Sequence, residues 1–251
     1  MHRFFLPPEI FRHSSPFLTG AEAHHCLSTL RLPVGEQVII FDGHGSEAKA
    51  TIACIKKERM LLSPMSRSFT PRPSIGITLA QAIPKAKNMG RLVQKAVELG
   101  VARIAPLISE RTVVQMDAVE GQRKQSRWEK IAIRACEQCG QNWLPHILRP
   151  SSLEEFLQSV GTEDFLLIAS LQEGACRLKD VLTDCLQKRR QPPERVAIFV
   201  GPEGDFTPEE VALARSRGCR PVTLGPSVLR SETAAVYCLS VLSYELNPYS
   251  S

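Results

Sequence analysis

The chain has 251 residues, of which 43% are hydrophobic, and a formal net charge of +5. This length allows one large domain or two modest ones. No stretch approaches the roughly 20 apolar residues that cross a bilayer, and the N-terminus lacks the pattern of a secretory signal. We therefore expect a cytoplasmic protein whose mild positive charge permits a polyanionic partner without requiring one.

The first part of the chain is predicted to be mainly β-structure. Residues 20–32 suit a short amphipathic helix, and residues 34–65 alternate in polarity around a Gly-rich turn at 42–45, which predicts strands joined by tight turns. The stretch 66–74 then contains three Ser, two Arg and two Pro. This composition predicts a boundary near residue 72, with one domain over 1–72 and a second over 73–251.

The second domain is predicted to alternate strands and helices. The expected strands are 75–83, 101–108, 165–170, 195–200 and 221–225, and the expected helices include 90–100, 127–140 and 233–246, the last of them apolar on more than one face. Such an alternation is typical of an α/β fold, in which helices cover both faces of a mainly parallel sheet.

Three of these strands end in sequences that suit a ligand site. They are followed by 170–174, by Gly-Pro-Glu-Gly at 201–204 and by Leu-Gly-Pro at 224–226. Ligands of open α/β sheets bind beyond the carboxyl ends of strands, and Gly-Pro loops can present bare backbone groups to a flat ring such as adenine. A tight turn without a ligand is the alternative. Neither a dinucleotide fingerprint nor a P-loop is present.

The cysteines do not indicate a metal. Eight are dispersed along the chain, and Cys136 with Cys139 form the one CxxC pair. A zinc site needs a second pair of ligands at suitable spacing, which the sequence lacks. We expect no metal, and reduced thiols that are mostly buried.

Basic residues gather in two regions, where they suit a surface that follows a phosphate backbone and binds with strong salt dependence. A solvated basic face is the alternative, and aromatic residues for base stacking are few. The candidate residues for such a phosphate-binding surface are Arg3, Arg12 and Arg31 in the first domain and Lys85, Arg91 and Arg111 in the second.

Four stretches become specific when taken together: QKAVELGVARIAPLISERTVV, RWEKIAIRACEQCG, GPEGDFTPEEV and LGPSVLRSETAAV. In this order and spacing they resemble the bacterial 16S ribosomal RNA (uracil-N3)-methyltransferases of the SPOUT (trefoil-knot) superfamily. HRFFL and AEAHHCLSTLRLPVGEQVIIFDGHG are similar to the RNA-binding domain of that family, so the resemblance covers nearly the whole chain. It implies a PUA-like β-barrel over 1–72, a knotted SPOUT α/β domain over 73–251, and a homodimer.

The resemblance also implies a reaction. An enzyme of this family methylates N3 of a specific uridine in the decoding region of 16S rRNA, on the assembled 30S subunit, with S-adenosylmethionine. The residues that match its cofactor loops are Leu171, Gly201, Glu203, Gly204, Leu224, Gly225, Leu229 and Thr233.

Two residues are candidates for the chemistry. Arg230 is expected to stabilise the uracil anion, and a salt bridge that fixes the loop is its alternative role. Glu232 is expected to accept or relay the N3 proton, and complementarity with the helix dipole is its alternative role.

The chain departs from the family pattern at four positions outside the cofactor loops. Arg134 replaces an acidic residue, Gln141 an arginine, and Asn88 and Gly90 replace charged residues. Two other functions stay open: a SPOUT methyltransferase with another target, such as a tRNA ribose hydroxyl, and an RNA-binding protein without catalysis. The N-terminal β domain and the ERTVV and EQCG segments disfavour the first, and the intact GPEG and LGPSVLRSET sequences disfavour the second.

Overall fold

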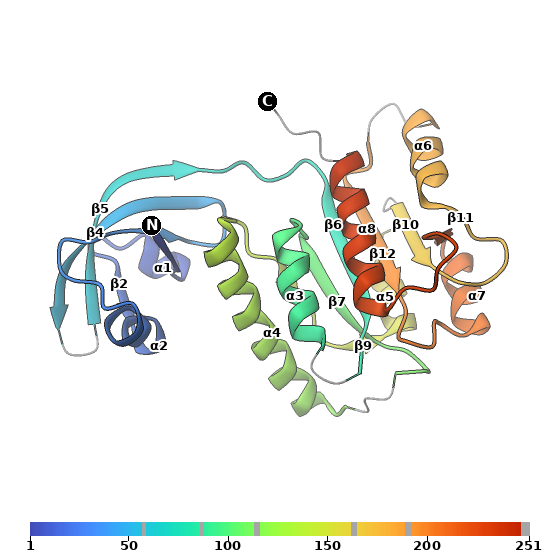
Figure 1. Cartoon of the computed structure of the whole chain (residues 1–251), viewed down its shortest axis with the longest axis horizontal. Coiled ribbons are helices and arrows are strands. Elements are labelled where there is room, and N and C mark those ends of the chain that lie inside the picture. The colour runs from blue at the N-terminus through green and yellow to red at the C-terminus, as the bar shows by residue number, and fades with distance from the viewer. Residues whose placement is uncertain (57–58, 86–87, 113–115, 162–164, 189–191, 247–251) are drawn as a thin grey trace. The chain divides into compact units, whose positions relative to one another are not determined.

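The protein has two compact units. The computed structural model describes residues 1–56, 59–85, 88–112, 116–161, 165–188 and 192–246, and Figure 1 shows their helices and strands. One unit comprises Met1–Arg72 with Ile133–Leu144, and the other comprises Pro73–Ala132 with Pro145–Ser251. The sequence placed 133–144 in the second domain, whereas in the structure this stretch packs with the first unit.

The first unit is a five-stranded sheet with the strand order β1-β3-β4-β5-β2 around one apolar core. The pair β1–β3 is parallel, and the other pairs are antiparallel. The strands are β1 (His2–Phe5), β2 (Phe17–Thr19), β3 (Gln37–Phe41), β4 (Ser46–Lys56) and β5 (Arg59–Phe69). The helices are α1 (Pro8–Phe11) and α2 (Gly20–His24), and α2 continues into a π-helical turn over His25–Thr29.

A polar network holds 133–144 within the first unit. The guanidinium of Arg3 lies 2.9 Å from the Glu47 carboxylate and donates to the Asn142 side-chain oxygen at 2.5 Å. The Asn142 amide nitrogen in turn donates to Glu47 at 3.1 Å and to the Thr70 hydroxyl at 2.9 Å. The contacts of Asn142 join segments that are more than 70 residues apart, which explains why the local sequence pattern does not place 142 with the N-terminal strands.

The second unit is built on a parallel sheet. The strand order is β11-β13-β10-β12-β6-β7-β8, and β9 also pairs with β7. Its strands are β6 (Gly76–Ala82), β7 (Arg103–Ile108), β8 (His146–Ile147), β9 (Ser151–Ser152), β10 (Phe165–Ala169), β11 (Cys176–Arg177), β12 (Arg195–Val200) and β13 (Arg220–Thr223). Every residue of β10 is buried, as expected for a parallel strand covered on both faces. The predicted α/β fold with an N-terminal PUA-like unit is confirmed.

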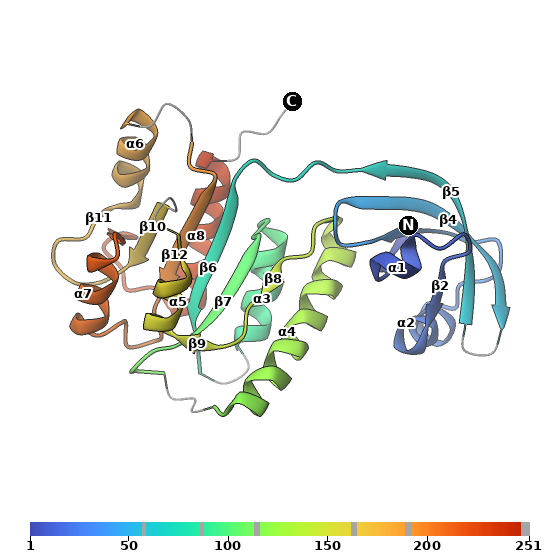
Figure 2. The same cartoon turned by 180° about the vertical axis from the view of Figure 1, so that it is seen from behind.

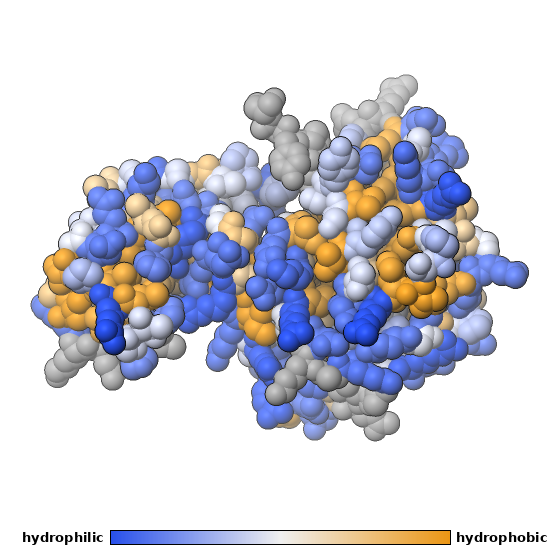
Figure 3. Space-filling model, in the orientation of Figure 1, coloured by the Kyte–Doolittle hydropathy of each residue, from blue (hydrophilic) through white to orange (hydrophobic). Residues whose placement is uncertain are grey.

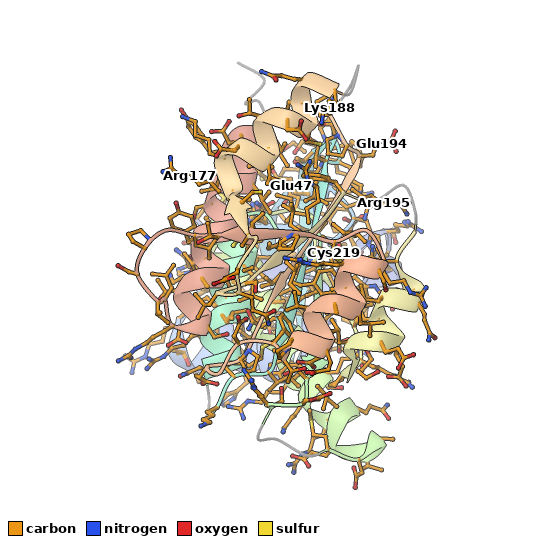
Figure 4. The ribbon with its side chains drawn as sticks, turned by 90° about the vertical axis from the view of Figure 1, so that its right-hand side faces the viewer. Glu47, Arg177, Lys188, Glu194, Arg195 and Cys219 are labelled. Carbon is orange, nitrogen blue, oxygen red and sulfur yellow. The ribbon has the colours of Figure 1, made fainter. Side chains whose placement is uncertain are left out.

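Helices cover both faces of this sheet. On one face α8 packs against α3, β6 and β12, and on the other α5 and α7 close an apolar core over β6, β7, β10 and β12 (Figures 1 and 2). The helices are α3 (Asn88–Glu98), α4 (Ala118–Cys139), α5 (Leu153–Ser159), α6 (Leu178–Lys188), α7 (Pro208–Ser216) and α8 (Ser231–Leu246). At the end of α6, Lys188 (Figure 4) pairs with Asp184 at 2.7 Å, and Asp184 also pairs with Arg220 of β13 at 2.9 Å.

One departure from the family pattern lies beside α4. A Cβ at Gly90 of α3 would lie 3.0 Å from the Ile131 Cδ1 of α4, closer than carbon atoms normally approach. A side chain at 90 would therefore require the end of the Ile131 side chain to shift.

Candidate functional site

The carboxyl ends of β10, β12 and β13 enclose a cleft of about 530 Å³, including its open mouth. The cleft is lined by Ala169–Leu171, Val200–Glu203, Asp205, Leu224–Gly225, Ser227–Leu229, Ser231 and Ala234. The three strand ends that the sequence singled out thus line one cleft.

The chain crosses this cleft on its way from β13 to α8. β13 pairs with β10, whereas α8 lies over β6 and β12, so 224–230 passes the loops that follow β10 and β12. Leu171 and Val228 border the cleft with side chains that are 62% and 73% exposed, and apolar surface is visible over the loop that leads into α8 (Figure 3). The exposed apolar side chains leave the cleft with walls suited to a flat ring.

The loop after β12 is a tight turn that excludes a side chain at Gly201. A Cβ there would lie 3.0 Å from the Phe206 nitrogen and 3.2 Å from two backbone carbons of Asp205. Asp205 has a φ of 61°, and its carboxylate accepts from the Phe206 nitrogen at 2.8 Å and from the Leu171 nitrogen at 3.0 Å. The Asp205 side chain therefore ties the loop after β10 to the loop after β12.

A capping box at 207–210 fixes the far end of this loop. The Thr207 hydroxyl accepts from the Glu210 nitrogen at 3.2 Å, and the Glu210 carboxylate accepts from the Thr207 nitrogen at 2.9 Å. The other carboxylate oxygen of Glu210 accepts from the Glu110 nitrogen at 3.0 Å. The start of α7 is thereby linked to the loop after β7.

Neighbouring loops also hold the outer side of 201–204. The Glu203 carboxylate accepts from the backbone nitrogen of Lys85 at 3.0 Å, after β6. The Arg111 guanidinium, after β7, donates to the Gly204 carbonyl. Both contacts fix the wall of the cleft from outside.

Most predicted cofactor residues line the cleft, namely Leu171, Gly201, Glu203, Leu224, Gly225 and Leu229. Gly204 and Thr233 do not, since Gly204 faces Arg111 and Thr233 is exposed on α8. Ser170 and Pro202 also line the cleft and lie in loops that the sequence singled out, although they were not among the predicted cofactor residues. The other lining residues outside that set are Ala169, Val200, Asp205, Ser227, Val228, Ser231 and Ala234. Their position beside matched motif residues is the signal that would have found them.

Arg230 and Glu232 alternate with residues that line the cleft, Leu229 and Ser231. The Arg230 side chain is exposed and forms no ion pair with a carboxylate of the described part of the chain. Its carbonyl accepts from the Ala234 nitrogen at 2.8 Å. Glu232 is half-buried in the first turn of α8. The loop-fixing salt bridge considered for Arg230 thus has no partner among the described residues.

The basic residues divide into exposed ones and a buried one. Arg12 and Arg31 are exposed in the first unit, and Lys85, Arg91 and Arg111 are exposed in the second.

Arg3 differs from these residues. Its side chain is only 12% exposed, pairs with Glu47 and lies 5.1 Å from the centroid of the Phe41 ring. These contacts stabilise the first unit, which gives Arg3 a structural role that the exposed basic residues lack.

The CxxC pair lies in the last turn of α4. Burial raises the pKa of the Cys136 thiol to about 12, which keeps it protonated and disfavours thiolate chemistry. Within the described ranges, no group of three or more His, Cys, Asp or Glu side chains is placed to hold a metal ion. Among the same residues, no helix combines the length and hydrophobicity needed to span a membrane.

Two family models match the chain. Residues 71–243 match the RNA methyltransferase domain, and residues 18–64 match the RNA methyltransferase PUA domain. Among curated proteins, ribosomal RNA small subunit methyltransferase E of Bacillus subtilis is 30% identical over 91% of this chain and 89% of its own length. The protein of the same name from Synechocystis is 28% identical over 96% of this chain and 77% of its own length.

Solved structures agree with these relatives. A putative methyltransferase from Legionella pneumophila in complex with the bound cofactor SAM is 36% identical, with a TM-score of 0.85 and 97% of each chain covered. A ribosomal RNA small subunit methyltransferase E from Neisseria gonorrhoeae, bound to S-adenosyl methionine, is 32% identical, with a TM-score of 0.84 and the same coverage.

Proposed function

The chain belongs to the RNA methyltransferase family that joins a PUA domain to an RNA methyltransferase domain, and we propose that it methylates N3 of a uridine in 16S rRNA. The observation that carries the proposal is the cleft at the ends of β10, β12 and β13, with Arg230 and Glu232 beside its lining. Relatives of similar length are rRNA small subunit methyltransferases, which supports rRNA as the substrate.

The cleft suits S-adenosylmethionine. Leu171, Leu224 and Leu229 provide apolar walls for an adenine ring, and residues 201–203 line the cleft beside them. One oxygen of the Glu203 carboxylate is bound by the Lys85 nitrogen, which leaves the other for a ribose hydroxyl or an ammonium group. When bound, S-adenosylmethionine supplies a methyl group activated by a positively charged sulfur.

The protein must make N3 of uracil a nucleophile. N3 carries a proton at neutral pH, and its loss spreads negative charge onto the flanking carbonyl oxygens. The unpaired Arg230 guanidinium stabilises that charge, and a preorganised donor of this kind is worth about 10²–10³ in rate. Glu232, one residue beyond Ser231, accepts the proton. Holding the base in line with the methyl group supplies much of the remaining acceleration.

The RNA contacts are proposed for exposed basic residues of both units. Arg12 and Arg31 of the PUA-like unit, with Arg91 and Arg111 of the second unit, bind phosphates of the assembled 30S subunit. Each phosphate contact releases counterions, so binding weakens as salt rises. A ribosomal substrate places the reaction in the cytoplasm.

Helix α8 carries the proposed homodimer. One face of α8 is buried against α3, β6 and β12. Tyr237 and Tyr244 on the helix are 44% and 77% exposed and lie seven residues apart, which places both on the opposite face. A second copy of this face is the proposed partner, since an isologous interface pairs the same surface of both subunits.

Incubation with S-adenosylmethionine carrying a labelled methyl group tests the reaction. Purified protein is offered 30S subunits, protein-free 16S rRNA or tRNA, and the labelled nucleosides are identified by mass spectrometry. We expect N3-methyluridine from 30S subunits. Label in a 2′-O-methyl nucleoside of tRNA would contradict the target, and no incorporation into any RNA would contradict the activity.

Variants separate catalysis from binding. Arg230→Ala is expected to lower the single-turnover rate by about 10²–10³ without weakening cofactor binding, while Arg217→Ala, an exposed arginine outside the cleft lining, serves as the control. Glu232→Gln should slow the reaction, with partial recovery as the pH rises and N3 ionises unaided. An Arg230→Ala protein that binds the cofactor poorly yet reacts normally at saturation would assign this residue to the cofactor site.

A further inference from the structure

A buried amide lies at the end of strand β6, next to the cleft. Gln81 is 0% exposed in a strand whose other residues are almost all apolar. Its side-chain nitrogen donates to the Ala82 carbonyl and to the Ser231 hydroxyl, each at 2.8 Å, and more weakly to the Val200 carbonyl at 3.4 Å. Burial of an amide is unfavourable unless hydrogen bonds compensate for lost water. The Gln81 nitrogen is compensated in this way, whereas its side-chain oxygen is buried without a partner among the described residues.

The partner of Gln81 is itself anchored to the cleft. Ser231 is 4% exposed, begins α8 and lines the cleft. While its oxygen accepts from Gln81, its hydroxyl donates to the Gly201 carbonyl at 2.6 Å. Gln81, Ser231 and Gly201 thus form a continuous chain of hydrogen bonds that joins β6, the start of α8 and the loop after β12.

The segment before Ser231 has few other anchors. Gly225–Val228 is exposed. Among the described residues, the hydrogen bonds of 225–230 outside regular elements are two weak ones between Thr223 and Gly225, at 3.4 and 3.5 Å, and the bond from Ala234 to the Arg230 carbonyl. The position of Arg230 against the cleft therefore depends mainly on Ser231, the next residue along the chain.

We propose that Gln81 is a positioning residue for methyl transfer, which acts through the Ser231 hydroxyl to hold Arg230 and the Gly201 loop in their places at the cleft. This inference rests on the proposed function, because it takes Arg230 to meet the substrate. Gln81 does not line the cleft, so it acts through Ser231 and not on the substrate. Rotation of the start of α8 would move Arg230 and Glu232 together, since both adjoin Ser231.

A double-mutant cycle tests the relay. Gln81→Met keeps the length of the side chain without the donor, and Ser231→Ala removes the hydroxyl. Each is expected to lower the single-turnover methylation rate on 30S subunits, at saturating S-adenosylmethionine, by about tenfold, the effect that one buried hydrogen bond commonly supports. The double variant should also be about tenfold slower, because side chains that act as one unit are not additive.

Two further variants separate positioning from stability. Ser231→Thr keeps the hydroxyl and should retain most of the rate. Thr78→Val is the control, because it removes another buried polar group of β6. The Thr78 hydroxyl accepts from Arg103 at 3.3 Å and lies outside the cleft lining. This variant should have a lower melting temperature and the wild-type methylation rate. Melting temperatures and calorimetric cofactor affinities are measured on every variant without RNA. Gln81→Met and Ser231→Ala should also weaken S-adenosylmethionine binding, because the Gly201 loop loses its anchor.

The outcomes separate this inference from the proposed function. Wild-type protein that leaves rRNA unlabelled would refute the function itself. If wild-type protein is active, two results would overturn the role of Gln81. In the first, Gln81→Met and Ser231→Ala lose stability as Thr78→Val does but keep the wild-type rate. In the second, the rate losses of the two single variants multiply to about a hundredfold in the double variant. If Gln81→Met does not fold, the methylation rates of Ser231→Ala and Ser231→Thr are compared instead. Equal rates for these two variants would overturn the proposal that the Ser231 hydroxyl positions the site.

Discussion

Replacing Gly201 by Ala tests the loop that we place against the cofactor. The added Cβ would lie 3.0 Å from the Phe206 nitrogen and 3.2 Å from the Asp205 Cα and carbonyl carbon. Because favourable contacts begin near 3.5 Å, the backbone at 205–206 must move away by about 0.3–0.5 Å. These atoms belong to the same tight turn, so the displacement changes the wall of the cleft.

The size of the effect follows from this crowding. Overpacking of this kind costs about 1–3 kcal/mol, and if all of it opposed cofactor binding, the affinity would fall about 5- to 150-fold. Part of the same strain should appear as lower stability without cofactor. Gly76→Ala in β6 is the matched control, since its Cβ would be 3.8 Å from its nearest neighbours, an ordinary contact.

Calorimetric titration with S-adenosylmethionine measures the change directly, and melting temperatures with and without the cofactor show whether the variant is folded. We expect weaker binding and a smaller ligand-induced rise in melting temperature for Gly201→Ala, and values close to the wild type for Gly76→Ala. A folded Gly201→Ala protein with wild-type affinity would refute the placement of the cofactor against this loop.

Three other predictions concern RNA, pH and assembly. Arg31→Ala should weaken 30S binding and reduce the slope of log affinity against log salt by about 1. An unchanged slope would contradict the contact between Arg31 and a phosphate. Arg3→Ala should instead lower the melting temperature. The hydrogen bond from Arg3 holds the pKa of Glu47 below its usual 4.5. The ionised carboxylate therefore stabilises the folded protein above pH 4.5, and this stabilisation is lost as the pH falls through the lowered pKa. Glu47→Gln should show a smaller loss of unfolding free energy on acidification, measured by denaturant titration, and an equal loss would contradict the assignment. Wild-type protein should scatter light as a dimer, and Tyr237→Asp with Tyr244→Asp as a monomer; an unchanged dimer mass would move the interface elsewhere.

Local sequence patterns predicted the parts of the fold that depend on local physics. Continuous apolar runs identified β10 and β12, because a parallel strand is buried on both faces. The Thr-Pro-Glu-Glu sequence at 207–210 is likewise a local signal for the start of α7, because a capping box and an N-terminal proline act within one turn. The general rule that ligands bind at the ends of parallel strands then brought the three loops of the cleft together.

The features that sequence reasoning missed depend on contacts between distant residues. The first turns of α4, from Ala118, are polar and lack apolar periodicity, so the predicted helix began at 127. The grouping of 133–144 with the first unit rests on the network around Arg3 and Asn142, which are 139 residues apart. Gln81 and Ser231 are 150 residues apart, and no local pattern marks a glutamine in an apolar strand as part of a site.

The most direct test of the central claim is nucleoside mass spectrometry of 16S rRNA from cells that lack this protein and from the same cells after it is restored. We predict that N3-methyluridine is lost from the decoding region without the protein, returns with the wild-type chain, and does not return with Arg230→Ala. An unchanged amount of N3-methyluridine in cells without the protein, together with the loss of a different modified nucleoside, would contradict the proposed reaction.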